Sequence, residues 1–281
     1  MALRINYNLA SSSAQRGLGA SQDAYAKQAT RLSTGLRINT ASDDAAGMAV
    51  SEKLKNQVRG LNQAQRNAQD GISLIQTAEG ALTETHSLLA RMRELAVQAA
   101  NDTLQDADRA NLQVEFTALY AEVDRIAAAT TFNGTYLLNN QGIATGMTFQ
   151  IGAFTDNTIT LTLGGAKMTS LNAAFNTAAA SLTTIGSRTQ ASAVISALDT
   201  AVNAVSTARA GFGAIQNRLE SIGRSLAVAS ENTAAANSRV ADADIASSMS
   251  ELVRAQILQQ AGISVLAQAN QAPALVLQLL K

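Results

Sequence analysis

The sequence contains no cysteine, one histidine and one proline among 281 residues. The missing cysteines exclude a disulfide framework, thiolate catalysis and Cys-ligated zinc. With His86 as the single imidazole, the chain has few first-choice ligands for a transition metal, so we expect no metal and no cofactor. Proline breaks helices more strongly than any other residue, so its near absence favours long helices.

The chain also lacks an excess of charge of either sign, since 21 basic residues balance 21 acidic ones. A nucleic-acid-binding surface normally carries a strong positive field, so we expect no nucleic-acid partner. One histidine cannot supply a nucleophile, a base and an orienting group together, and SLLA follows His86 where an HExxH zinc protease needs Glu and a second His. We therefore predict no catalytic residues.

The last 28 residues, RAQILQQAGISVLAQANQAPALVLQLLK, carry charge only at their two ends, Arg254 and Lys281. A membrane span needs about 20 predominantly apolar residues, whereas this tail is interrupted by glutamines and by Pro273. Its larger apolar residues form a stripe with amides between them, which is typical of a packing face. The tail therefore predicts contact with another protein surface, without membrane insertion, through Ile257, Ile263, Leu266, Val276, Leu277 and Leu280.

Heptad periodicity is the strongest signal in the chain. From Val194 to Ala243, apolar residues alternate at spacings of four and three with Thr233 as the one exception, which indicates a coiled-coil seam. A second seam repeats every seven residues from Leu54 to Ala96, and a third runs from Leu112 to Ile126. The predicted seam residues are Leu61, Ile75, Leu82, Leu89, Phe116, Val123, Phe212, Ile215, Leu219, Ile222 and Leu226.

Turn and cap residues set the expected boundaries. Ser42 to Asp44 can cap a helix that continues to about Asn101, and Asp106 with Asp108 places negative charge on the first turn of the next helix. We prefer this capping role to a calcium site, because the cluster lacks the Gly and terminal Glu of an EF-hand loop. Alternating residues then predict a β-hairpin over about 132–165, followed by a Gly-, Ala-, Ser- and Thr-rich linker over about 164–192.

These features together predict a mainly α fold, in which long antiparallel coiled-coil helices form a rod with a small β-hairpin. Residues 1–41 and 242–281 should pair as terminal helices, while residues 42–241 form the coiled-coil domain. The N-terminal segment has apolar residues at helical spacing, namely Leu18, Tyr25 and Leu32. Isolated helices of this kind are marginal in water, so we expect both terminal segments to become ordered on association.

Several motifs resemble bacterial flagellin. They are RLSTGLRINTASDDAAGMAV (31–50), QRNAQDGISLIQTAEGAL (65–82), RMRELAVQAAND (91–102), FNG (132–134) and RAQILQQAGISVLAQANQAP (254–273). The resemblance covers a flagellin N-terminal region of about 3–140, extending to about 165, and a C-terminal region of about 195–281. It implies a self-assembling subunit of the motility filament, with the terminal helices in the inner tube and the rod outside. The additional outer domains of many flagellins are missing from the short middle of this chain.

The same resemblance implies several partners and a location. The chain should polymerise with itself, pass unfolded through the flagellar export apparatus with a secretion chaperone on its C-terminal segment, and meet filament-cap and hook-junction proteins. The first residues, MALRINYNLASSSAQ, lack the basic start and apolar core of a cleavable signal peptide, so we expect an extracellular protein exported without one.

Arg91, Leu95 and Glu115 match the flagellin surface bound by the mammalian Toll-like receptor for flagellin. The alternative is that this stretch serves only as a subunit contact, and both roles can hold together if the surface is hidden after assembly. Ala90, where Gln is common in the family, departs from the pattern.

Two other functions remain open at this stage. A minor flagellin or hook–filament junction protein would share the same terminal helices, although the intact C-terminal motif favours a bulk subunit. A membrane-active secreted helical protein belongs to another class, and flotation with liposomes would separate it from a filament subunit.

Overall fold

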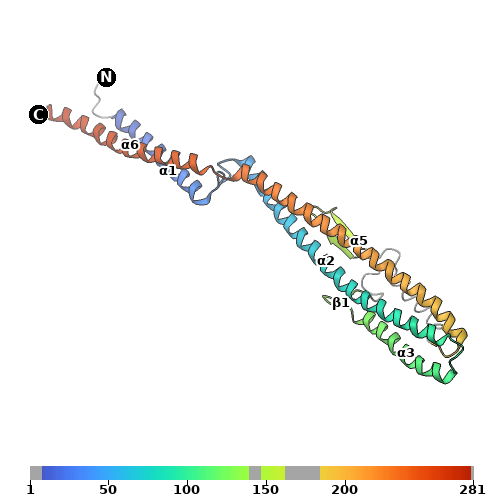
Figure 1. Ribbon diagram of the computed structural model, residues 1–281. Helices are drawn as coiled ribbons and strands as arrows, with labels where there is room; N and C mark the ends of the chain where they lie inside the picture. The colour runs from blue at the N-terminus through green and yellow to red at the C-terminus, as the bar shows by residue number, and fades with distance from the viewer. Residues whose placement is uncertain (1–7, 139–146, 162–183, 280–281) are drawn as a thin grey trace. The chain divides into compact units, whose positions relative to one another are not determined.

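The computed structural model describes residues 8–138, 147–161 and 184–279, and for 161 and 272–279 it describes the backbone alone (Figure 1). Its long helices are α1 (Leu9–Thr34), α2 (Ala45–Ala99), α3 (Asp106–Ala129), α5 (Arg188–Ala241) and α6 (Ile245–Leu279). The chain separates into two compact units, one of residues 1–58 with 232–281 and one of residues 59–231. The sequence analysis predicts the first boundary at 41/42 instead of 58/59, and the second at 241/242 instead of 231/232.

The unit of residues 59–231 is built on the heptad seams of α2, α3 and α5. Its main core is a large cluster of buried aliphatic and aromatic side chains, with Phe116 and Phe212 among the largest fully buried ones. Leu61, Ala64 and Leu226 form a second, smaller cluster. Alanines such as Ala78 and Ala201 are also fully buried, which lets the helices approach closely. Burial of these stripes is the main source of stability here, because apolar area removed from water contributes about 25 cal/mol per Å².

Two small antiparallel strand pairs occupy the region where the sequence predicts one hairpin. β1 (Thr131–Phe132) pairs with β2 (Thr135–Tyr136) around a turn in which Asn133 and Gly134 both have positive φ. This backbone is typical of a tight hairpin turn and explains the FNG motif. β3 (Met147–Gln150) pairs with β4 (Thr158–Leu161). Most of the predicted linker, residues 162–183, lies outside the described residues, and α5 begins at Arg188, inside the predicted linker.

Helix caps agree with the physical roles expected for the acidic residues. The Asp44 carboxylate accepts a hydrogen bond from the Gly47 backbone N–H at 2.8 Å, so Asp44 caps the start of α2. Gln105 and Asp108 form a capping box at the start of α3. Among the described residues, no group of three or more His, Cys, Asp or Glu side chains could hold a metal ion.

The unit of residues 1–58 and 232–281 pairs α1 with α6 in antiparallel orientation. Gly35 ends α1 in the left-handed conformation with φ of 71°, which favours glycine because other residues lose stability there. Its carbonyl then accepts a hydrogen bond from the Ala243 N–H, and the Arg37 N–H donates to the Ala241 carbonyl. These bonds join the segment that follows α1 to the segment between α5 and α6.

Candidate self-association surface

The paired helices α1 and α6 bury little within the subunit. No residue of α1 is buried, and among the described side chains of α6 only Ser248 and Ala255 are. The pair is held instead by polar contacts and small residues. The Asn8 side-chain amide donates to the Ala269 carbonyl at 2.8 Å, and the Leu18 side chain lies against Gly262. Two helices with so small a shared core have most of their surface available for other contacts.

The structure divides the sequence-predicted assembly residues into two groups. Leu18, Leu32 and Leu266 are half-buried, whereas Tyr25, Ile257 and Ile263 are exposed. The side chains of Val276 and Leu277 lie outside the described residues, as does Leu280 as a whole. The predicted residues therefore contribute both to the intramolecular pair and to its outer surface.

An exposed apolar stripe on α6 begins closer to the N-terminus of the helix than the residues predicted from the sequence, which start at Ile257. Ile245, Met249, Val253 and Ile257 follow one another at intervals of four residues and are 46–59% exposed. This spacing puts them along one side of the helix. Leu258 and Val265 are exposed on another side, so α6 is apolar on more than the face that meets α1. The four-residue spacing is visible in the sequence, but Ile245, Met249 and Val253 lie before Arg254, where the uncharged tail begins.

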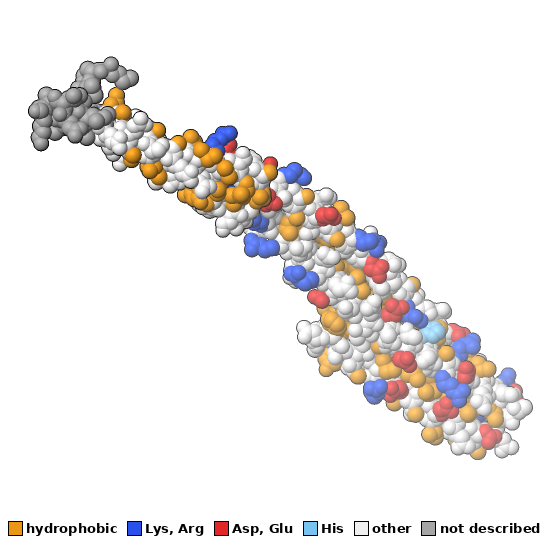
Figure 2. Space-filling view, turned by 60° about the vertical axis from the view of Figure 1, so that its left-hand side comes forward, with side chains coloured by type: hydrophobic (Ala, Val, Ile, Leu, Met, Phe, Trp, Pro, Cys, Tyr) orange, Lys and Arg blue, Asp and Glu red, His pale blue; other side chains and the backbone are white. Residues whose placement is uncertain are grey.

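Charge is sparse on this surface. Glu251 and Arg254 are the only charged residues of α6, and they pair with each other at 3.3 Å. In Figure 2, hydrophobic side chains gather over the terminal helices with few charged ones among them. Removing a charge from water is costly. Because the stripe has few charges near it, its burial against another surface would carry little of this cost.

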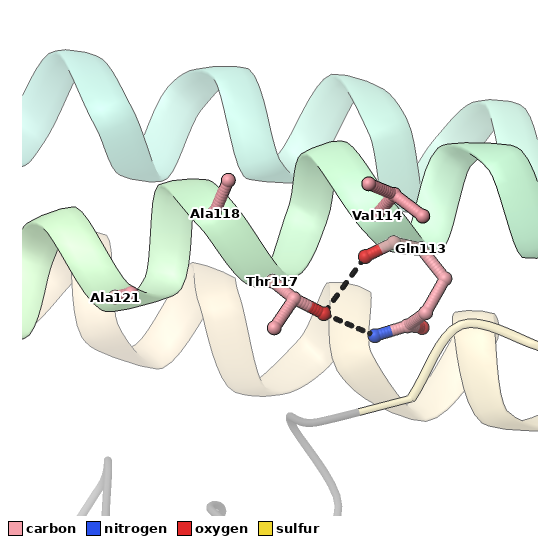
Figure 3. Close-up of a pocket in the computed structure, with 5 residues that line it drawn as sticks. All are labelled: Gln113, Val114, Thr117, Ala118 and Ala121. Atoms are coloured by element: carbon pink, nitrogen blue, oxygen red, sulfur yellow. Dashed lines mark hydrogen bonds between the residues drawn. The ribbon is translucent and has the colours of Figure 1, made fainter.

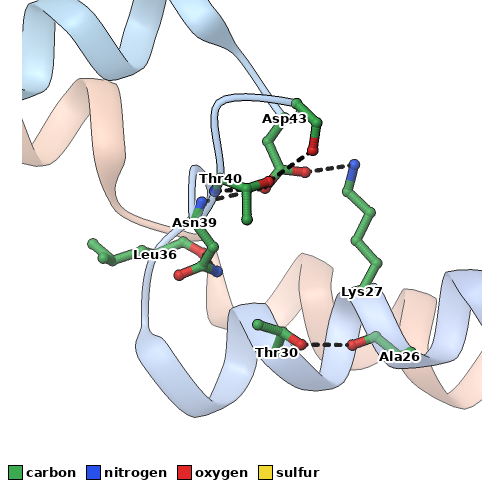
Figure 4. Close-up of polar contacts among 8 residues, drawn as sticks. Ala26, Lys27, Thr30, Leu36, Asn39, Thr40 and Asp43 are labelled. Carbon is green, nitrogen blue, oxygen red and sulfur yellow. Dashed lines mark hydrogen bonds and ion pairs between the residues drawn. The ribbon is translucent and has the colours of Figure 1, made fainter.

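A polar cluster fastens α1 to the loop that leads into α2 (Figure 4). Lys27 of α1 forms an ion pair with the Asp43 carboxylate at 2.8 Å, and Asp43 also accepts the backbone N–H groups of Asn39 and Thr40. The hydrogen bond from Lys27, followed by those from the backbone, holds the pKa of Asp43 well below its usual range. The carboxylate thus fixes the loop beside the terminal helix.

The predicted seam residues lie in the unit of residues 59–231. Of these, Ile215 and Ile222 are partly exposed and pack against the core. The remaining predicted seam residues are buried, namely Leu61, Ile75, Leu82, Leu89, Phe116, Val123, Phe212, Leu219 and Leu226.

The three residues predicted for receptor recognition differ in accessibility. The Arg91 guanidinium donates to Glu94 and to Glu115, each at 2.9 Å, and these bonds raise the pKa of Arg91, with Glu94 the larger cause. Arg91 and Glu115 are about half exposed. Leu95 is only 1% exposed because its side chain belongs to the buried seam of α2. Leu95 therefore presents no side-chain surface to a partner in this conformation.

Comparison with known proteins gives a consistent result over nearly the whole chain. Residues 5–143 match the family described as the bacterial flagellin N-terminal helical region, and residues 195–280 match the bacterial flagellin C-terminal helical region. The chain is 48% identical to a flagellin of Halalkalibacterium halodurans over 99% of both proteins, and 44% identical to a flagellin of Bacillus subtilis over 99% of this chain and 100% of the relative. The crystal structure of Bacillus cereus flagellin is 34% identical, with a TM-score of 0.50 over 57% of this chain and 88% of that one.

Proposed function

The chain belongs to the bacterial flagellin family and is a structural subunit of the flagellar filament, and from that premise we propose that α1 and α6 carry its principal self-association surface. The observation behind this proposal is the exposed apolar stripe Ile245, Met249, Val253 and Ile257, on a helix with only two charged residues. A patch that binds a different patch on an identical neighbour makes a heterologous contact, and repetition of that contact produces a helical polymer.

Seeded polymerisation of stripe variants tests this assignment. We expect the double substitution Met249→Ser and Val253→Ser to raise the critical concentration at least tenfold, since two half-exposed apolar side chains would no longer be buried on assembly. Val228→Ser on α5, where the valine is 58% exposed, is the matched control. Equal critical concentrations for the double variant, the control and the wild type would contradict the proposal, provided that all three monomers have the same thermal unfolding.

Export and location follow from the same assignment. We propose that the subunit leaves the cell through the flagellar export apparatus without a cleaved signal peptide, with a secretion chaperone covering the apolar α6 segment before export. Filament-cap and hook-junction proteins would meet the same terminal helices at the filament ends. The stripe supports the chaperone step, because an exposed apolar helix invites premature association in the cytoplasm. A pull-down with α6 as bait should capture the chaperone, and the same pull-down with the double serine variant should not. No helix within the described ranges has the length and apolar character needed to cross a membrane.

We also propose that the free monomer is recognised by the mammalian Toll-like receptor for flagellin through Arg91 and Glu115. These two side chains bridge α2 and α3 at the surface and supply both signs of charge. In a receptor-reporter cell assay, Arg91→Ala with Glu115→Ala should reduce the response relative to the wild-type monomer. No response to the wild-type monomer, beside an active control flagellin, would remove this proposal.

A further inference from the structure

The outer face of α3 carries an apolar hollow that the subunit's own core leaves open. It has a volume of about 490 Å³ and is lined by Gln113, Val114, Thr117, Ala118 and Ala121, all from α3 (Figure 3). Val114 is 72% exposed, whereas Phe116 and Val123 of the same helix are fully or almost fully buried in the core. The helix therefore has a second apolar face that points away from the bundle.

Hydrogen bonds hold one edge of this hollow in place. The Gln113 side-chain amide donates to the Thr117 hydroxyl at 3.0 Å, and that hydroxyl donates to the Gln113 carbonyl at 2.8 Å. The Gln113 side-chain oxygen accepts the Ile185 backbone N–H at 2.6 Å, which ties α3 to the segment before α5. A surface with its polar groups already paired loses little on receiving an apolar side chain.

An exposed aromatic side chain lies elsewhere in the same unit. Phe154 is 63% exposed in the turn between β3 and β4. The turn is braced by the Gln150 side chain, which donates to the Gly152 and Phe154 carbonyls, and by the Asn157 N–H, which donates to the Phe154 carbonyl. A rigid turn that presents a single large apolar side chain is well suited to insertion into a hollow, since little conformational freedom is lost on binding.

One charged side chain of each sign lies near the two features. Asp156 lies two residues after Phe154, is exposed, and forms no ion pair among the described residues. Arg125 follows Ala121 by four residues, so its backbone lies on the hollow's side of α3, while its side chain pairs with Glu122 at the groove between α3 and α2. Glu122 accepts two of its hydrogen bonds, and the guanidinium has five N–H donors, so donors remain for a second carboxylate.

The distance along α2 decides which molecule can supply the aromatic side chain. The turn packs at Gly60, where a Cβ would lie 3.0 Å from the Ala153 side chain, whereas α3 is tied to α2 by the pair of Arg91 with Glu115. These positions are about 30 residues apart on one helix, or about 45 Å at 1.5 Å per residue. The turn of one subunit cannot reach its own hollow, but a copy displaced by about this length along α2 can.

We propose that Phe154 of one subunit inserts into the α3 hollow at Val114, Ala118 and Ala121 of the next subunit, with Asp156 meeting Arg125. This inference rests on the proposed self-assembly and adds a second contact to the one made by the terminal helices. The contact joins two different patches, so its repetition links subunits head to tail in a row parallel to α2.

Cysteine cross-linking tests the contact directly, because the chain has no native cysteine. Protein with Val114→Cys and protein with Phe154→Cys are mixed, polymerised on filament seeds and treated with a short bismaleimide. We expect a dimer containing one chain of each kind in filaments and none in monomer. A mixture of Val228→Cys with Phe154→Cys is the control, since Val228 is also an exposed valine, at 58%, but lies on α5. Normal filaments without the Val114–Phe154 product, or with no more of it than the control, overturn this inference alone, while failure of the wild-type chain to polymerise overturns the proposed assembly.

Polymerisation strength gives a second measurement. Phe154→Ala should raise the critical concentration about 10- to 100-fold, as expected for the loss of one buried aromatic side chain, and Phe154→Leu should restore most of it. Val114→Glu should have an effect similar to that of Phe154→Ala. A Phe154→Ala protein that polymerises at the wild-type critical concentration contradicts the proposal.

Discussion

Arg109 offers the sharpest test of how the long helices are connected. Its side chain is 8% exposed and reaches from α3 back to the end of α2, where Nε donates to the Ala99 carbonyl at 2.9 Å and Nη2 donates to the Asn101 carbonyl at 3.0 Å. Nη1 pairs with Asp106 at 2.8 Å, but Asp106 is 86% exposed, so this ion pair adds little. The guanidinium therefore acts mainly as a cap for α2 that comes from the following helix.

The magnitude follows from what is left behind on truncation. Ala99 is fully buried, so in Arg109→Ala its carbonyl loses its side-chain donor away from water, which costs about 1–3 kcal/mol. The loss of a positive charge from a helix C-terminus adds up to about 1 kcal/mol. We expect Arg109→Ala to lower the free energy of unfolding by about 3 kcal/mol, or the melting temperature by about 6–12 °C.

Arg125→Ala is the matched control, measured beside Arg109→Ala by thermal and urea unfolding followed by circular dichroism. Arg125 lies on the same helix and pairs with a carboxylate three residues earlier, as Arg109 does, but its side chain is 65% exposed. An exposed pair of this kind contributes about 0–1 kcal/mol. Arg109→Lys should lower the free energy of unfolding by less than Arg109→Ala but should not leave it unchanged. A single ammonium cannot span both carbonyls as the planar guanidinium does. Equal stabilities of the Arg109→Ala and Arg125→Ala proteins would refute the capping role.

Three further predictions concern the core, the loop and the terminal helices. Leu89→Ala should cost about 2–5 kcal/mol of unfolding free energy through the cavity it leaves, whereas Val97→Ala, at a 49% exposed position, should change it by less than about 0.5 kcal/mol in the same denaturation assay. The pKa of Asp43 is lowered in the folded chain, so its contribution is complete above the unfolded pKa of about 4 and declines as the pH falls toward the folded pKa. Asp43→Asn should therefore flatten the acid side of the stability profile, and identical profiles would contradict a stabilising role for the Asp43 carboxylate. Circular dichroism should show more helix in filaments than in monomer, since α1 and α6 share so small a core, and equal helicity would remove the expectation of folding on association.

Heptad spacing made the helical core predictable from sequence. Leu82, Leu89 and Phe212 recur at positions that only a helix can bring to one side, and a repeat held over several heptads leaves little choice of partner face. The mainly α fold and the flagellin family are confirmed. The β region was harder to read, because β1 and β2 contain two residues each and their pairing depends on the positive φ angles of Asn133 and Gly134 rather than on alternation.

Surface features needed the structure for a different reason. Leu95 directly precedes the seam residue Ala96, and the sequence alone does not show that its side chain is buried in the core. Phe154 and the α3 hollow lie far apart in the chain, and their relation appears only when both are located along α2. Arg109 likewise reads as one more surface arginine until its distances to the end of α2 are known.

The central claim, that the terminal helices drive polymerisation, is tested most directly by electron microscopy of seeded assembly. Full-length protein is compared with protein that lacks residues 254–281, at equal concentration and on the same filament fragments. The account predicts filaments from the full-length chain alone, because truncation removes Ile257, Ile263 and Leu266 together with Gly262 and Ala269, which contact α1. Filaments of equal length from both proteins would contradict it.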